Sequence, residues 1–72
     1  MVKVDILELR GLIAKRGHSL RSFSKNSGIS ISYLSEIVNG KVSPSPKMAK
    51  RISNALGVEI EYLFKFKKEE MK

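Results

Sequence analysis

Apolar residues along the first sixteen positions recur at intervals of three and four, which is the spacing of one face of an α-helix. The series is Val2, Ile6, Leu9, Leu12 and Ile13. The pattern predicts a helix over residues 2–16, which ends at Gly17 after two basic residues in its last turn. Gly11 falls inside this helix at a cost of about 1 kcal/mol relative to alanine, so either close packing requires it or the helix tolerates the loss.

Residues typical of helix ends mark three further helices, each with a serine cap and a glycine stop. The pairs are Ser19 with Gly28, Ser30 with Gly40, and Ser45 with Gly57. Pro46 follows the third cap at the first helical position, where proline is favoured. After Gly57, the apolar residues Ile60, Leu63 and Phe64 predict a fifth helix. No segment shows the alternation of a strand, so the predicted fold is all-α, five short helices around one core.

The chain has 72 residues, enough for one small domain that buries about 60% of the surface of its unfolded chain. We expect this domain over residues 1–66, followed by a charged, frayed tail at residues 67–72. With no cysteine and one histidine, the chain cannot form a disulfide or a thiolate site, and we expect no metal and no cofactor. His18 precedes the cap Ser19, and Phe23 occupies the fourth helical position, so His18 is interpreted as a packing residue.

The charge balance points to a polyanionic partner. Fourteen Lys and Arg against seven Asp and Glu give a net charge of +7, which suits nucleic acid or an anionic membrane surface. The membrane is the weaker choice, because no helix joins a large apolar face to a concentrated basic one. The start of the chain has no apolar leader pattern, and no apolar run approaches the roughly 18 residues of a membrane span. We therefore expect a soluble, cytoplasmic protein.

The helix that follows Ser30 has an outer face of small polar residues. At 100° per residue, its apolar positions define a core direction, and Ser32 and Glu36 lie within about 20° of the opposite direction. Their flanks are Tyr33, Ser35 and Asn39. Small polar side chains favour close approach to another surface. A turn of three or four residues with Gly28 joins the preceding helix, as in a helix-turn-helix unit, whose second helix enters the major groove of DNA.

These marks occur together in the order of a known family. The segments "SLR", "GIS", "SYLSEI", "NGK", "ALG" and "YLF", with Pro44-Ser45 between them, resemble the Xre family of bacterial and phage regulators, which has the lambda-repressor-like and Cro-like fold. The resemblance covers residues 17–64. It implies a five-helix domain that binds operator DNA as a dimer, at the nucleoid of a bacterial or phage-infected cell.

The resemblance also implies roles for individual residues. Those that look like base-facing positions are Ile31, Ser32 and Glu36. Those that look like backbone-facing positions are Ser19 and Arg21 at the start of the second helix, and Asn39, Lys41 and Ser43 near the loop after the third. To the backbone-facing set we add Lys25, Ser30, Tyr33, Ser35 and Lys47, which lie at or beside the same side of the unit. Four cations of this set are the expected phosphate contacts: Arg21, Lys25, Lys41 and Lys47.

Two positions depart from the family pattern. Leu20 stands where many members carry a glutamine that contacts phosphate, and Ile31 stands where a charged or amide side chain often reads a base. Ile31 can either pack against the second helix or contact a thymine methyl group. Glu36 can be a solvated residue or accept a hydrogen bond from a cytosine amino group. Tyr33 can donate to phosphate or cover the helix edge, and Asn39 can contact phosphate or only stop the helix.

Aromatic residues close to the end of the fifth helix predict a homodimer. Ile60, Leu63 and Phe64 can face the core, whereas Tyr62 and Phe66 add aromatic surface that so small a monomer has little means of burying. The predicted interface consists of Tyr62, Phe64 and Phe66. The alternative is that they pack within the monomer beneath the first helix. A two-fold dimer would hold its two reading helices about 34 Å apart, which predicts a pseudo-palindromic operator in double-stranded DNA.

Two functions are compatible with these features. The first is a stand-alone, sequence-specific regulator of transcription, a repressor that reads the major groove. The second is an interaction module of the same fold that pairs with another regulator or a toxin, which the departures at Leu20 and Ile31 favour. An enzyme is not expected, because the serines lack a paired base, and no small-molecule ligand is evident.

Overall fold

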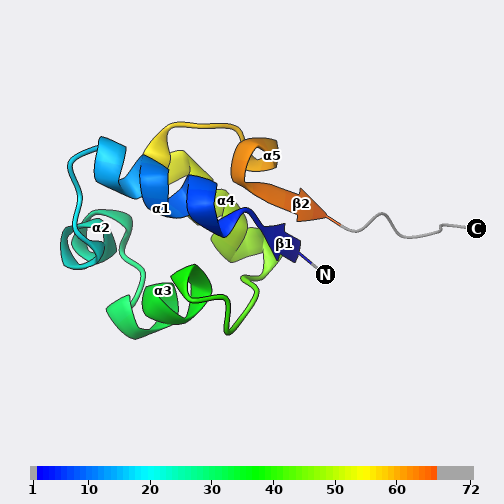
Figure 1. Ribbon diagram of the computed structural model, residues 1–72, viewed down its shortest axis with the longest axis horizontal. Helices are drawn as coiled ribbons and strands as arrows, with labels where there is room; N and C mark the ends of the chain where they lie inside the picture. The colour runs from blue at the N-terminus through cyan, green and yellow to red at the C-terminus, as the bar shows by residue number, and fades with distance from the viewer. Residues whose placement is uncertain (1, 67–72) are drawn as a thin grey trace, which may run out of the picture.

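The computed structural model describes residues 2–66, which form five helices and a two-stranded sheet around one apolar core (Figure 1). The elements are β1 (Val2–Val4), α1 (Ile6–Lys15), α2 (Leu20–Ser27), α3 (Ile31–Val38), α4 (Pro46–Leu56), α5 (Ile60–Leu63) and β2 (Phe64–Phe66). The predicted fold of five short helices is confirmed, and the small sheet is an addition to it. The predicted tail at residues 67–72 lies outside the described residues.

The first helix starts later than its apolar spacing predicted. Asp5 is the N-cap of α1, and its Oδ1 accepts a hydrogen bond from the Glu8 amide at 3.2 Å. Val2 therefore lies in a strand and not in the first helical turn. Its side chain is buried in the core all the same, so a spacing of four from Ile6 was compatible with either conformation.

The prediction that the chain contains no strand is wrong at the two ends of the domain. β1 pairs antiparallel with β2, with Val2 opposite Phe66 and Val4 opposite Phe64. Each strand has three residues in the order apolar, lysine, apolar, which is too short for its alternation to stand out. An isolated two-stranded sheet is only marginally stable in water. This sheet is stabilised because Val2 and Phe64 are buried in the core.

The serine caps and glycine stops are confirmed. The hydroxyl oxygens of Ser19, Ser30 and Ser45 accept hydrogen bonds from amides three residues later, at 3.0, 3.2 and 3.2 Å. Gly28 and Gly57 end α2 and α4 in the left-handed conformation. The fifth helix begins at Ile60 as predicted but has only four residues, because the chain turns into β2 at Phe64.

The core is closed by polar contacts at its margins. The Asp5 amide donates to the Leu63 carbonyl at 2.9 Å and so joins the start of α1 to the end of α5. Ser53 is fully buried, and its hydroxyl donates to the Ala49 carbonyl at 2.9 Å. Arg16 Nε donates to the Leu56 carbonyl at 3.1 Å, where a cation suits the C-terminal end of α4. Within residues 2–66, no helix has the length and apolar character needed to span a membrane.

Gly11 lies on the exposed side of α1, and a Cβ atom added there would meet no atom within 4 Å. Close packing within the monomer is therefore not the reason for this glycine. The helix tolerates a residue that favours the unfolded chain.

Replacing Gly11 with alanine is expected to stabilise the domain by about 1 kcal/mol, because alanine has the higher helix propensity. Thermal unfolding followed by circular dichroism should show a midpoint about 4–8 °C higher. Gly28→Ala is the matched control, and it should destabilise the fold because Gly28 has a φ of 75°. A lower midpoint for Gly11→Ala would contradict the assignment of open space at this position.

Candidate nucleic-acid interface

The N-terminal end of α2 is held by a ring of short polar contacts. Ser19 and Ser22 form a capping box, in which each hydroxyl accepts the backbone amide of the other residue at 3.0 Å. His18 Nδ1 lies 2.9 Å from Ser22 Oγ, and the His18 ring lies 5.6 Å from that of Phe23. The contact with Phe23 supports the interpretation of His18 as a packing residue. The start of α2 is therefore held by several contacts within the chain.

The turn between α2 and α3 is fixed by one buried residue. Gly28 takes the left-handed conformation, and Ile29 after it is 2% exposed. Ser24 Oγ donates to the Ile29 carbonyl, and the Ile29 amide donates to Ser27 Oγ at 3.3 Å. Both polar groups of the Ile29 backbone are thus bonded to serines of α2. This arrangement sets the direction in which α3 leaves the turn.

The outer face of α3 lies as its angular positions predicted. Leu34, Ile37 and Val38 are buried, whereas Ser32 and Glu36 are exposed. No hydrogen bond within residues 2–66 uses the side chain of Ser32 or Glu36. In Figure 1, α2 and α3 lie together on one side of the molecule, and β1 lies near the loop that follows α3. The two side chains are free to meet a partner.

Ile31 and Tyr33 differ in their surroundings. Ile31 is 39% exposed, so part of its side chain is open to a partner and the rest is covered by the domain. Tyr33 is half-buried against the core, which fits a residue that covers the edge of α3. Leu20 packs against the core in the same way, and its role at the start of α2 is therefore structural.

Several predicted backbone-facing residues already have partners within the domain. Ser30 Oγ accepts from the Tyr33 amide, and its hydroxyl hydrogen can still donate. Asn39 Nδ2 donates to Ser35 Oγ at 3.3 Å, which joins these two side chains at the C-terminal end of α3. Ser19 Oγ is used in the capping box. The cap roles of Ser19 and Ser30 are visible in the structure, whereas a contact with DNA is not tested by it.

The loop after α3 presents Lys41 and Ser43 to solvent. Gly40 has a φ of 74°, and the Lys41 amide donates to the Glu36 carbonyl at 2.8 Å. A Cβ atom on Gly40 would also approach Ile6 Cδ1 to 3.1 Å, so the loop leaves the helix close against α1. Pro44 is buried. Lys41 and Ser43 are therefore exposed side chains on an ordered loop.

The four predicted phosphate contacts, Arg21, Lys25, Lys41 and Lys47, are all exposed. Arg21 and Lys25 are four residues apart on α2 and so share one face of that helix. Arg51 was not predicted at this surface, yet its Nη2 lies 3.7 Å from the position of a Cβ on Gly28. Sequence spacing could not reveal this, because the approach of α4 to the turn is a tertiary contact.

The three residues predicted at a dimer interface lie in different surroundings. Phe64 is 1% exposed and packs in the core of its own chain, as its place beside Ile60 and Leu63 in the apolar spacing allowed, so its side chain offers no surface to a second copy. Phe66 is exposed on β2. Tyr62 is exposed too, and its hydroxyl donates to Glu8 Oε2 at 2.8 Å.

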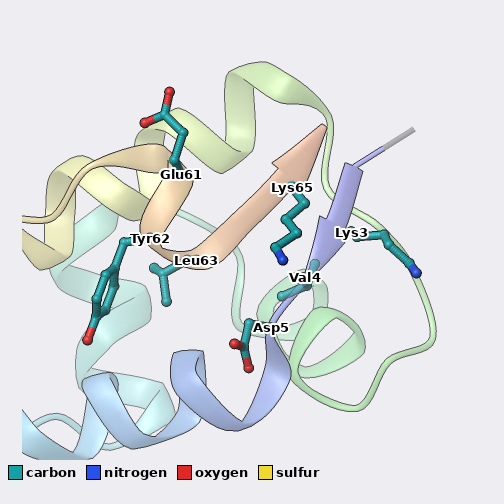
Figure 2. Close-up of a pocket in the computed structure, with 7 residues that line it drawn as sticks. All are labelled: Lys3, Val4, Asp5, Glu61, Tyr62, Leu63 and Lys65. Carbon is teal, nitrogen blue, oxygen red and sulfur yellow. The ribbon is translucent and has the colours of Figure 1, made fainter. Parts of the chain in front are cut away.

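A surface hollow of about 260 Å³ lies between β1, β2 and α5. Figure 2 shows Tyr62 directed toward α1 at one side of this hollow, with Glu61 and Lys3 directed away from it. Its charged lining residues do not converge on one point, so it offers no evident catalytic geometry. Among residues 2–66, no group of three or more His, Cys, Asp or Glu residues is placed to hold a metal ion.

Comparison with known families gives a match over most of the chain. A family model described as helix-turn-helix, of the Xre-like and lambda-repressor/Cro-like kind, matches residues 6–63. The matched segment runs from the first residue of α1 to the last residue of α5. No curated protein and no solved structure gives a significant match to the chain.

Ser24→Ala is expected to destabilise the domain by about 1 kcal/mol, because it removes the hydroxyl that satisfies the carbonyl of the buried Ile29. Ser32→Ala is the matched control, and its effect should stay within about 0.5 kcal/mol because the side chain is exposed and unbonded. Urea unfolding of both variants gives the comparison. Equal effects would show that the hydroxyl of Ser24 does not hold the turn.

The hydrogen bond from Tyr62 to Glu8, together with the negative charge of Glu8, raises the pKa of Tyr62 above its ordinary value of 10.0. The stabilising contact is fully present below the pKa of the unfolded chain and is lost as the pH rises through the higher pKa of the folded state. Ultraviolet titration in a Tyr33→Phe background isolates this phenol. Glu8→Ala should bring its midpoint back toward 10.0, and an unchanged midpoint would argue against the contact.

Proposed function

The chain belongs to the Xre-like helix-turn-helix family of DNA-binding regulators, and we propose that it is a sequence-specific repressor that reads the major groove of double-stranded DNA with α3. The observation that carries this proposal is the exposed, unbonded pair Ser32 and Glu36 on a helix whose other side is fully buried. Repression is the simplest effect of the proposed binding, because a bound domain blocks access to the DNA that it covers.

The size of α3 supports insertion into the groove. An α-helix with its side chains is about 10–12 Å across, and the major groove is about 12 Å wide. The outer face of α3 carries small residues near the N-terminal end, the end at which recognition helices contact bases. Long charged side chains there would hold the helix away from the base pairs.

Each proposed base contact has a distinct chemistry. The Ser32 hydroxyl can donate or accept, and it is the group nearest the outward direction. Ile31 offers an apolar surface for a thymine methyl group. An ionised Glu36 accepts hydrogen bonds and cannot donate them. It therefore favours the amino group of a cytosine and disfavours a guanine, which presents only acceptors in the major groove. The three residues would therefore specify a short stretch of sequence in each half-site.

The exposed cations supply affinity that is independent of sequence. Arg21, Lys25, Lys41 and Lys47 are the proposed phosphate contacts, and Arg51 beside the turn can extend this set. With four phosphates neutralised per subunit, the slope of log K against log salt would be about −3.6 per subunit, at about −0.9 per phosphate. Phosphate contacts would set the register of α3 on the duplex.

Two copies bound to one duplex complete the proposed function. Reading helices about 34 Å apart would meet successive major grooves on one side of DNA, so the operator would be a pseudo-palindrome. Tyr62 and Phe66 are the exposed aromatic residues that the sequence analysis assigned to the contact between copies. The site of action would be the cytoplasm, where the DNA lies.

Selection from a pool of random duplexes at two salt concentrations tests this function. We expect a two-fold symmetric motif and a binding constant that falls steeply with salt. A slope near zero would exclude DNA as the partner. Salt-sensitive binding without any motif, together with tight binding to a second protein, would instead favour the interaction module.

Substitutions on the selected site separate base contacts from phosphate contacts. Ser32→Ala and Glu36→Gln should relax the preference at one base pair each, by about 1–3 kcal/mol. Glu59→Gln is the matched control, because it makes the same charge change at an exposed residue that caps α5 without a side-chain hydrogen bond.

Lys41→Ala should weaken binding to all sequences alike and reduce the salt slope by about 1. Lys65→Ala on β2 removes the same charge from an exposed residue outside the helix-turn-helix unit and should leave the slope unchanged. If Ser32→Ala and Glu36→Gln leave base preference intact, the assignment of α3 as the reading helix is wrong.

A further inference from the structure

The outer side of α1 is an uncovered apolar face. Leu7 is 84% exposed, and Gly11 and Ala14 are exposed as well. At 100° per residue these three lie within about 60° of one another, opposite the buried Leu9 and Leu12. In Figure 1, α1 lies at the front of the molecule with no other element over it. We call Leu7, Gly11 and Ala14 the α1 face.

A shallow apolar hollow of about 210 Å³ borders this face at Ala14. Its lining residues are Arg10, Ile13, Ala14, His18, Leu20 and Val38. The helix therefore carries a protruding leucine toward one end and a receiving hollow toward the other. The hollow adjoins the α1 face on the flank that carries Arg10, so a leucine that protrudes from a second copy can reach it.

We propose that the α1 face is the surface through which two copies of this chain associate, with their α1 helices antiparallel and crossing near Gly11. The contact is isologous, because the leucine of each copy meets the hollow of the other. This inference rests on the proposed function, since the pseudo-palindromic operator requires two copies. It replaces an interface centred on Phe66 with one centred on α1.

The spacing along the helix fits this arrangement. At a rise of 1.5 Å per residue, Leu7 lies about 6 Å before Gly11 and Ala14 lies about 4.5 Å after it. A two-fold axis through Gly11 therefore brings Leu7 of one copy to within about 1.5 Å of the level of Ala14 in the other. Gly11 lets the two helices approach closely at the crossing, which gives a role to a glycine that the monomer does not require.

The charges beside the face are complementary in the same arrangement. Glu8 and Lys15 lie on one flank of α1, within about 20° of each other, on opposite sides of Gly11. When the two α1 helices are antiparallel about a two-fold axis, this flank lies on the same side of the dimer in both copies. Glu8 of each copy then lies level with Lys15 of the other to within about 1.5 Å, and two such pairs form.

The position of α3 selects the antiparallel arrangement independently. α3 lies on the other flank of α1, where Arg10 Nη1 is 3.5 Å from the Val38 carbonyl oxygen. An antiparallel two-fold leaves this flank, and hence both α3 helices, on one side of the dimer, so that both can face a single duplex. A parallel two-fold along the helix axis would turn them to opposite sides.

The length of α1 sets the strength of the contact. Ten residues span about 15 Å, which is short for an interface of the standard size of about 1,600 Å². We therefore expect a weak dimer in solution that becomes complete when two half-sites hold the copies side by side. Tyr62, which is bonded to Glu8, lies at the rim of the contact and not at its centre.

Sedimentation equilibrium of the full chain at high protein concentration tests the surface. Leu7→Ser should raise the dimer dissociation constant by at least about tenfold, because it removes the apolar group that is buried twice. Gly11→Gln should raise it similarly while it leaves thermal stability equal or higher, since glutamine favours the helix. Phe66→Ser is the control on the sheet. Loss of the dimer with Phe66→Ser but not with Leu7→Ser overturns the proposal.

A charge exchange tests the orientation. Lys15→Glu should weaken the dimer, since Glu8 of the other copy would face a like charge. Adding Glu8→Lys to the same chain should restore the dissociation constant to within about threefold, because both pairs form again with the charges reversed. If the double variant dimerises no more tightly than Lys15→Glu alone, the antiparallel arrangement is overturned.

Duplexes with one or two half-sites separate this inference from the proposed function. The Leu7→Ser chain should bind a single half-site as tightly as the unmodified chain and should lose cooperative binding to two. If the unmodified chain binds neither duplex, the proposed function fails, whatever the sedimentation shows. If Leu7→Ser binds two half-sites with unchanged cooperativity, the inference fails and the proposed function stands.

Discussion

Ile29 sits between the two helices of the helix-turn-helix unit, and its burial decides where α3 points. Its side chain is part of the core, and its backbone amide and carbonyl are both bonded to serine hydroxyls of α2. A buried backbone group without a partner would cost several times the worth of one hydrogen bond, so the turn has few alternatives. The outer face of α3 is useful only because this turn holds its inner face against the core.

The serines of this chain divide into two kinds. Ser19, Ser30 and Ser45 begin helices, while Ser24 and Ser27 hold the turn, and all have partners within the domain. Ser32 has the same side chain in an exposed position without such a partner. A composition rich in serine therefore says little about binding by itself. The distinction depends on what each hydroxyl contacts, and this sets Ser32 apart from its neighbours.

The helices of this fold could be predicted from sequence because their ends are chemically marked. Serine caps and left-handed glycines act through local backbone geometry, so residues such as Ser45 and Gly57 reveal helix ends without a structure. The direction of Ser32 and Glu36 followed from the same local geometry. β1 and β2 could not be predicted, because three-residue strands exist through their pairing across the whole chain.

The surroundings of Phe64 and Leu7 depend on tertiary packing, which the sequence pattern does not show. Phe64 was expected at a dimer interface, yet the pairing of β2 with β1 carries it into the core. Leu7 lies about 150° from the centre of the apolar series that predicted the first helix, so its outward direction follows from helical periodicity. Only the structure shows that no other element of the monomer covers it. The proposed cation Arg51 depends likewise on how α4 packs, which no spacing along the chain encodes.

The pairing of Val2 with Phe66 has a practical consequence for how this domain can be joined to others. The two ends of the described fold lie side by side, at the end of the molecule away from α2 (Figure 1). A fluorescent reporter, an affinity tag or a second domain fused at either end would leave from the same place, far from α2 but beside the loop that follows α3. The same proximity allows the domain to be inserted whole into a loop of a host protein, because that loop needs to open only by the width of two paired strands, about 5 Å.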